Sequence, residues 1–201
     1  MSAKRVMDLL GASLGLLVFS PVLVACAVAV KLSSHGPVFF RQERVGLHGK
    51  PFRIRKFRTM RVTDGSGLQV TAAGDARITA VGRLLRRSKL DELPQLIDVL
   101  VGNMSIVGPR PEVPRYMAMY ASDVRAQILS VRPGITDNAA IAFRDEERLL
   151  AEADDVERTY VEVIMPIKQQ YYLDYVKQHS VMGDLVILAR TFRAIAKPQE
   201  R

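Results

Sequence analysis

Two adjacent carboxylates, Asp91 and Glu92, carry the strongest chemical signal in the sequence. Apolar residues at helical spacing follow them: Leu93, Leu96, Ile97 and Leu100. Pro94 is tolerated only in the first turn of a helix, because the N–H groups of that turn have no partner in any case. The helix is therefore predicted to begin close to Asp91, with both carboxylates at the positive end of its dipole.

Adjacent helical positions point about 100° apart, so Asp91 and Glu92 are not expected to share a proton. Two distinct roles fit better. An ionised Asp91 can attack a phosphoryl group, while Glu92 holds Mg²⁺ that neutralises a diphosphate. The alternative is that both residues only stabilise the start of a helix.

Basic residues stand close to this pair in the sequence. Arg86, Arg87 and Lys89 precede it. Arg110 lies between two prolines that stiffen its backbone, which suits bidentate recognition of a phosphate. Arg132, in an Arg-Pro-Gly turn, is a weaker instance of the same arrangement.

The overall charge also points to an anionic partner. The chain has 201 residues, 48% of them hydrophobic, and a formal net charge of +8. Phosphates, nucleic acid and anionic lipid head groups all fit this charge, although the absence of Trp disfavours a platform for stacking single-stranded bases. Cys26 is the single cysteine, so there is no disulfide framework or CxxC metal site, and a reducing, cytosol-facing catalytic part is expected.

An apolar segment, residues 6–30, precedes the carboxylates and is long enough to cross a bilayer. Asp8 lies at its start, and Ser20-Pro21 interrupts it near the middle, where proline removes a backbone hydrogen bond. Basic residues flank both ends, which favours keeping both on the cytoplasmic side. We therefore expect a re-entrant membrane helix over residues 1–32, broken at Ser20-Pro21, and a catalytic domain on the cytoplasmic face over residues 33–201.

Two alternatives stay open for this segment. One is a kinked helix that crosses the membrane once. The other is a lipoprotein-type secretion signal cleaved before Cys26. Apolar residues continue beyond Cys26 to Leu32, which argues against the signal.

The rest of the chain predicts a mixed α/β fold. Val38–Arg44 and Phe52–Met60 are expected to form a β-hairpin around a Gly46–Gly49 turn. Its second strand is rich in basic residues, including Lys56 and Arg58, and is either a solvated edge or a surface that faces phosphates. Residues 62–76 have the composition of a loop. Helical patterns follow at Ile78–Arg87, Pro114–Ser130, Asp145–Tyr160 and Ser180–Ala196, and Pro166 interrupts another; the first suits an amphipathic helix at a membrane surface.

The motifs together resemble the monotopic phosphoglycosyl transferases, also called bacterial sugar transferases, in their small single-domain form. The resemblance covers nearly the whole chain and rests on five strings in the same order: Ser20-Pro21, KFRTM (Lys56–Met60), LDELPQL (Leu90–Leu96), GPRP (Gly108–Pro111) and RPGIT (Arg132–Thr136). Each string alone is weak, but the combination is specific.

The resemblance implies an enzyme of the bacterial inner membrane with its active site on the cytoplasmic face. It implies that Asp91 attacks the β-phosphate of a UDP-sugar and releases UMP, and that polyprenol (undecaprenyl) phosphate then takes the sugar phosphate from the aspartyl intermediate. Glu92 matches the residue associated with Mg²⁺. Lys56, Arg86 and Arg110 match basic positions near the phosphates, and a homodimer is compatible with the family.

Two departures from the family pattern fall where sugar and nucleotide would be recognised. Residues 137–144 (DNAAIAFR) replace a glycine-containing run, with Arg144 in place of its terminal Arg. Tyr172 stands where many members have Asp. The sequence therefore does not identify the sugar.

An alternative from another functional class is a membrane-tethered basic module that binds nucleic acid or anionic lipid without chemistry. It is motivated by the net charge and the Arg-rich strand, but it leaves the arrangement of Asp91, Glu92 and Pro94 unexplained. We therefore expect a UDP-sugar, polyprenol phosphate and membrane lipid as partners, and no nucleic acid.

Overall fold

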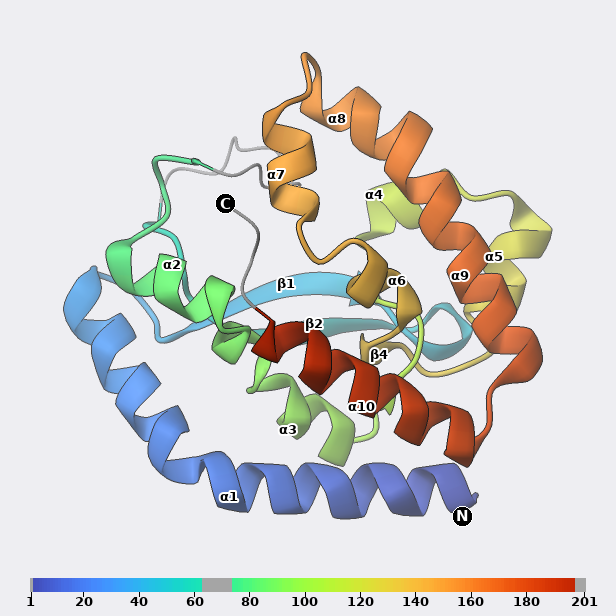
Figure 1. Ribbon diagram of the computed structural model, residues 1–201, viewed down its shortest axis with the longest axis horizontal. Helices are drawn as coiled ribbons and strands as arrows, with labels where there is room; N and C mark the ends of the chain where they lie inside the picture. The colour runs from blue at the N-terminus through green and yellow to red at the C-terminus, as the bar shows by residue number, and fades with distance from the viewer. Residues whose placement is uncertain (1, 63–73, 198–201) are drawn as a thin grey trace.

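A two-stranded antiparallel hairpin lies at the centre of the molecule, and helices surround it (Figure 1). The computed structural model describes residues 2–62 and 74–197, so most of the loop expected over residues 62–76 lies outside the described residues. Strand β1 (Phe39–Val45) pairs with β2 (Pro51–Phe57) in a register that sets Phe40 opposite Lys56. A short 3-10 turn, η1 (Leu47–Gly49), joins the strands. The predicted hairpin and the mixed α/β fold class are confirmed.

Helix α1 (Ala3–Ser33) runs along one side of the domain and bends near its middle (Figure 1). It is continuous through Pro21, so the predicted break at Ser20-Pro21 is a bend within one helix. Proline has no N–H to offer the carbonyl of Leu17, four residues earlier. The Ser20 hydroxyl donates to that carbonyl at 2.8 Å instead. Ser20 thus compensates for the hydrogen bond that Pro21 removes.

The first half of α1 is fixed to the domain by buried polar contacts. Asp8 is buried and accepts hydrogen bonds from the Ser105 hydroxyl at 2.9 Å and the Ile106 backbone N–H at 3.0 Å. Lys4 Nζ donates to the carboxylate of buried Asp184 at 2.5 Å. Asp8 is therefore satisfied inside the protein and does not face lipid.

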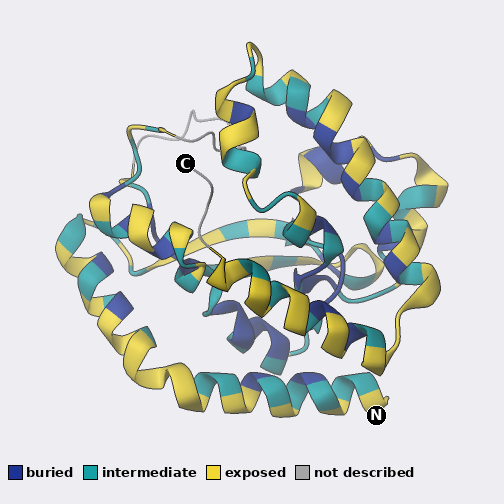
Figure 2. Cartoon of the chain, in the orientation of Figure 1, coloured by how far each residue is buried: buried dark blue, intermediate teal, exposed yellow. Residues whose placement is uncertain are grey.

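The outward side of α1 is apolar and exposed along its length (Figure 2). Its large exposed side chains include Leu10, Leu14, Leu17, Val24, Val28 and Leu32. By length and composition, α1 is the one helix among the described residues that could cross a membrane. A helix docked along one side and apolar on the other fits a membrane association.

Two short helices and a turn between them position the carboxylate pair of Asp91 and Glu92. Helix α2 (Ala80–Arg87) packs against α1, and the 3-10 turn η2 (Leu90–Glu92) leads into α3 (Gln95–Leu100). Helix α3 lies between α1 and β2, where Ile54, Leu96 and Val99 form an apolar cluster with Ala12. The sheet and α1 thereby fix the position of η2.

A second, parallel strand pair joins β3 (Ser105–Val107) to β4 (Gly134–Thr136). The two strands lead into and out of a close backbone approach between Gly108 and Gly134. A Cβ on Gly134 would stand 2.1 Å from the Gly108 nitrogen, so only glycine fits there. We call this contact the glycine clasp; it holds the GPRP and RPGIT strings together.

The remaining helices form an outer wall. They are α4 (Pro114–Met117), α5 (Ser122–Ile128), α6 (Asn138–Ala142), α7 (Glu146–Ala151), α8 (Val156–Thr159), α9 (Met165–Gln178) and α10 (Val181–Ala196). A π-helical turn, η3 (Tyr160–Ile164), connects α8 to α9. Buried residues of α4, α5, η3 and α9, among them Tyr116, Ile128, Tyr160 and Tyr172, make the largest apolar core.

Two of the helices expected from the sequence are each divided in the structure. The pattern over Pro114–Ser130 forms α4 and α5, and that over Asp145–Tyr160 forms α7 and α8. The second division follows from Asp155, whose side chain accepts from the Arg158 N–H and so begins a new helix. Pro166 stands in the first turn of α9, where its missing N–H costs nothing.

Candidate active site

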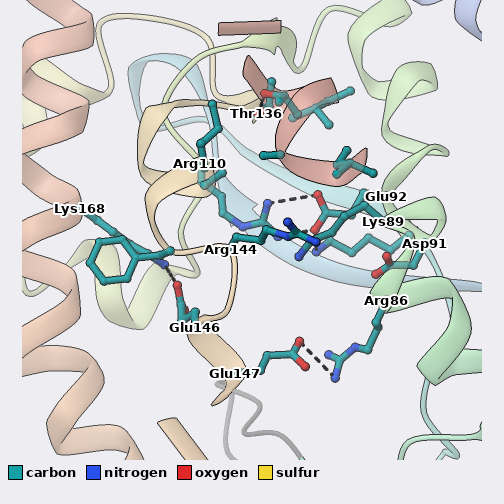
Figure 3. A pocket seen from close by; sticks show the side chains of 18 of the residues that line it. Arg86, Lys89, Asp91, Glu92, Arg110, Thr136, Arg144, Glu146, Glu147 and Lys168 are labelled. Carbon is teal, nitrogen blue, oxygen red and sulfur yellow. Dashed lines mark hydrogen bonds and ion pairs between the residues drawn. The ribbon is translucent and has the colours of Figure 1, made fainter. Parts of the chain in front are cut away.

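A cavity of about 380 Å³ lies between the hairpin, η2, α9 and α10, and its walls differ in chemistry. One end is charged, with Asp91, Glu92, Lys56 and Arg110. The opposite end holds Lys168, Glu146 and aromatic side chains (Figure 3). A third wall is apolar and comes from α3, β3, β4 and α10: Leu96, Ile106, Ile135, Leu188, Phe192 and Ile195.

Glu92 is held at the charged end by two cations. Lys56 Nζ lies 2.8 Å from Glu92 Oε1, and the Arg110 guanidinium contacts both carboxylate oxygens, at 2.5 and 3.2 Å. Burial alone would raise the pKa of Glu92, but Arg110 and Lys56 hold it well below its ordinary value. Glu92 is therefore ionised at neutral pH.

Asp91 has the opposite environment, although it is the next residue. It is 7% exposed, and its Oδ1 has no hydrogen-bond partner within the described part of the chain. Burial and then the charge of Glu92 raise its pKa to about 6. Glu92 is thus an ionised carboxylate paired with two cations, whereas Asp91 has a carboxylate oxygen without a hydrogen bond. This difference supports two different roles.

The local backbone explains how these two side chains are presented. Lys89 ends the α2 segment in the left-handed region, with φ 56°, which is uncommon for a residue other than glycine. The 3-10 turn η2 follows at once, and Pro94 directly precedes α3. The helix was predicted to begin close to Asp91; α3 begins at Gln95, and both carboxylates lie in the turn ahead of it.

Three further predicted residues lie at the cavity, besides the carboxylates and Arg110. Lys56 is half-buried, and desolvation lowers its pKa to about 8 despite the opposing effect of Glu92. Arg86 lines the cavity and lies 3.5 Å from Glu147. Arg144 also lines it, although one of its nitrogens donates to the Lys197 carbonyl at 2.7 Å.

Two predicted residues, Arg58 and Arg132, do not line the cavity. The Arg58 guanidinium is buried against the end of α1, where it donates to the carbonyls of Ser34 and Pro37. Arg132 donates to the Gly102 carbonyl at 3.0 Å. Both therefore hold backbone segments in place.

The cavity also contains charged residues that were not expected from the sequence: Arg44, Glu112, Glu146 and Lys168. Lys168 is buried, pairs with Glu146 and lies over the rings of Tyr160 and Phe143. These residues come from separate segments with ordinary polar patterns, so no local signal marks them. Tyr172, noted in the sequence as a departure, is buried and lines the same end.

The residues present fit a magnesium ion only if a substrate supplies the rest of the ion's coordination shell. Among residues 2–62 and 74–197, no group of three or more Asp, Glu, His or Cys side chains is arranged to hold a metal. Mg²⁺ is commonly held by one or two carboxylates together with substrate phosphates. Glu92, with the unpaired Oδ1 of Asp91 beside it, supplies this kind of donor set.

Comparison with known proteins gives a consistent result over the whole chain. The model of the bacterial sugar transferase family matches residues 1–198. A UDP-glucose:undecaprenyl-phosphate glucose-1-phosphate transferase of Escherichia coli (strain K12) is 43% identical over 192 residues, which cover 94% of this chain and 39% of that protein. A UDP-N-acetylgalactosamine-undecaprenyl-phosphate N-acetylgalactosaminephosphotransferase of Aeromonas hydrophila is 38% identical over 195 residues, covering 96% and 43%.

A third relative is closer to this chain in length. It is a UDP-glucose:undecaprenyl-phosphate glucose-1-phosphate transferase of Caulobacter vibrioides, 40% identical over 191 residues that cover 94% of this chain and 67% of that protein. The chain thus spans about two fifths of the length of the Escherichia coli and Aeromonas relatives. The three names share a UDP-sugar and undecaprenyl phosphate; two of them name glucose and one names N-acetylgalactosamine.

Proposed function

This chain belongs to the bacterial sugar transferase family, and on that premise we propose that it transfers a sugar 1-phosphate from a UDP-sugar to undecaprenyl phosphate and releases UMP. The names of the relatives support the donor and acceptor classes. The observation that carries the proposal is the unpaired carboxylate oxygen of Asp91, which lines a cavity beside a Glu92 held by Lys56 and Arg110.

In the proposed first step, a carboxylate oxygen of Asp91 attacks the β-phosphorus of the donor. The bond between that phosphorus and the bridging oxygen breaks, and UMP leaves with the bond's electron pair. Lys56, Arg86 and Arg110 line the same cavity and supply positive charge around the two phosphates. Because Asp91 makes no hydrogen bond through Oδ1, no contact has to break before it attacks.

In the proposed second step, an oxygen of undecaprenyl phosphate attacks the phosphorus held on Asp91. The phosphorus–Asp91 bond breaks, and the free carboxylate is restored. The apolar wall formed by α3 and α10 gives the first isoprene units of the acceptor an apolar surface next to the charged end. The product is a lipid-linked sugar diphosphate.

We further propose Mg²⁺ as the cofactor, held by Glu92 and the donor phosphates. It would neutralise the charge that develops on the leaving UMP. Glu92 serves this role as an anion, which its low pKa favours. When the donor enters, its phosphates are alternative partners for the cations that now contact Glu92.

The apolar face of α1 supports a membrane-bound enzyme, and we propose that it enters the inner membrane from the cytoplasmic side and returns to it. The buried contacts of Lys4 and Asp8 hold the first half of α1 on the domain, and Val30 and Cys26 pack the second half against Phe57 and Leu85. Both halves therefore touch the same domain. This arrangement favours a re-entrant helix over one that crosses the bilayer once.

A membrane-tethered basic module has less support from the same structure. Three of the basic residues on and after β2 are engaged within the protein: Arg55 with Asp98, Lys56 with Glu92, and Arg58 with the end of α1. They do not form a free cationic surface for a polyanion.

The proposal is tested with detergent-solubilised full-length chain, Mg²⁺, undecaprenyl phosphate and a panel of UDP-sugars. UMP release from at least one donor is expected. When undecaprenyl phosphate is omitted, a burst of UMP no larger than one equivalent of enzyme is expected, because Asp91 is loaded once and not regenerated. Absence of UMP release with every donor contradicts the function, and sustained release without acceptor contradicts the two-step route.

A further inference from the structure

The end of the cavity away from Asp91 has the composition of a binding site. Tyr116 and Tyr172 line the cavity and are 2% and 1% exposed, yet neither hydroxyl has a hydrogen-bond partner in the described part of the chain. A buried polar group without a partner costs free energy. Two such hydroxyls on residues that line one cavity are candidates for hydrogen bonds to a ligand.

Arg110 separates the aromatic end of the cavity from the end that holds Asp91. Arg110 lies between them (Figure 3): it contacts Glu92 directly, and its pKa is raised by Glu92 first and also by Tyr172 and Glu146. The groups that shift the pKa of Asp91 are its own burial, Glu92, Lys56, Lys89 and Arg86, all at the other end. The cavity therefore runs from Asp91 past Arg110 to the end that holds Glu146 and Lys168 (Figure 3).

Phosphoryl transfer sets which part of the donor can lie along this line. The attacking and leaving oxygens stand roughly in line on opposite sides of the phosphorus. With Asp91 as the attacking group and the phosphates at Arg110, the leaving UMP points away from Asp91. The sugar, attached through one of the other oxygens, is directed to the side.

The aromatic end has the mixture of aromatic and polar groups that recognises a nucleoside. The rings of Tyr116 and Tyr160 lie 5.0 Å apart, and Phe143 and Tyr160 flank Lys168. Aromatic side chains offer flat faces to a base, and phenol hydroxyls can both donate to and accept from its edge or the ribose hydroxyls. Lys168 and Glu146 add a donor and an acceptor at the same end.

We propose that the nucleoside of the donor, and not its sugar, occupies the end formed by Tyr116, Tyr172 and Lys168, with the Tyr172 hydroxyl hydrogen-bonded to it. This inference rests on the proposed function, since it takes Asp91 as the nucleophile and a UDP-sugar as the donor. It assigns base and ribose recognition to residues of α4 and α9, and it leaves the sugar to the opening beside Arg86 and Arg144.

The test compares two phenols that differ in position only. Tyr172 lines the cavity, whereas Tyr120 is also buried with an unpaired hydroxyl but does not line it. Binding of UMP and of glucose 1-phosphate is measured on the full chain carrying Asp91→Asn, which cannot turn over. Adding Tyr172→Phe is expected to weaken UMP binding roughly fivefold and to leave glucose 1-phosphate unchanged, because one hydrogen bond is lost.

Tyr120→Phe serves as the matched control and is expected to change neither ligand. Tyr116→Phe is a second test, with a loss of UMP affinity in the same direction. The inference is overturned if Tyr172→Phe and Tyr116→Phe bind UMP as tightly as their parent, or if only glucose 1-phosphate binding weakens. Failure of the wild-type chain to release UMP from any donor is a separate result, which would instead contradict the proposed function.

Discussion

Two groups of buried carboxylates in this molecule have opposite hydrogen bonding. Under α1, Asp8 is bonded to Ser105 and Ile106, and Asp184 to Lys4 and Tyr175. At the cavity, Asp91 is also buried, but its Oδ1 has no partner among the residues described. The first group stabilises the fold, because each charge is compensated. The second has a buried carboxylate oxygen without a hydrogen bond and a raised pKa, a combination that is concentrated at functional sites.

The largest effect is expected from Asp91→Asn. This change removes the nucleophile, so UMP release should fall by roughly a thousandfold or more. Stability should not fall, because the substitution removes a desolvated charge that makes no ion pair. Donor turnover and thermal unfolding in the same detergent test both parts. An enzyme that keeps full UMP release would show that Asp91 is not the nucleophile.

Asp184→Asn should show the reverse behaviour. It leaves Lys4 without its anionic partner beneath α1, and the free energy of unfolding should fall by about 2 kcal/mol, somewhat less than for a fully buried pair because Lys4 is partly exposed. UMP release per folded molecule should change little. Asp174→Asn, at an exposed carboxylate outside the cavity, is the control and should shift stability by less than about 0.5 kcal/mol. A large loss of activity without loss of stability would contradict the comparison.

The pH dependence of UMP release should report the ionisation of Asp91. Asp91 must be ionised to attack and its pKa is raised to about 6, so the rate should rise with pH up to about 6 and fall about tenfold per unit below it. Lys56 has its pKa lowered to about 8, so the rate should decline again as Lys56 loses its proton above that pH. Lys56→Arg keeps the charge and should move the alkaline limb upward. A rate that stays constant from pH 5 to 7 would exclude a raised pKa at the nucleophile.

The smallest effect is expected at the bend of α1. Ser20→Ala removes the hydroxyl that donates to the Leu17 carbonyl, and the free energy of unfolding should fall by about 1 kcal/mol. Ser13→Ala, at an exposed serine of the same helix, is the matched control. Thermal unfolding in detergent compares the two. Equal values for both variants would mean that the Ser20 contact does not stabilise the bend.

Patterns within one segment predicted the fold well. Two strand patterns around the Gly46–Gly49 turn predicted the hairpin, and the helical pattern over Ser180–Ala196 predicted α10. The strands β3 and β4 could not be predicted in this way, because each has three residues and their pairing joins segments far apart in the sequence. The division of Pro114–Ser130 into α4 and α5 also went unpredicted, since both pieces have the same helical pattern.

Site residues could be predicted only where their neighbours in the sequence form an unusual motif. Asp91, Glu92 and Arg110 stand in unusual local contexts, and they do lie together at the cavity. Arg58 looks equivalent to Lys56 in the sequence, yet one binds the end of α1 and the other binds Glu92. Lys168 lies on a helix with no distinguishing neighbours. The partner of a charged side chain depends on which segments the tertiary fold brings together, and the local sequence does not contain this information.

The glycine clasp makes the segment between Gly108 and Gly134 an exchangeable cassette. Its two ends are fixed to each other by backbone hydrogen bonds, from Gly108 to Thr136 and from Gly134 to Pro109. The segment also carries α4 and α5, whose residues Tyr116 and Ile128 belong to the largest apolar core, so an exchange has to preserve their packing. Chimeras that graft this cassette from a relative should therefore keep Arg110 in register while they exchange the α4 residue, Tyr116, that reaches the cavity.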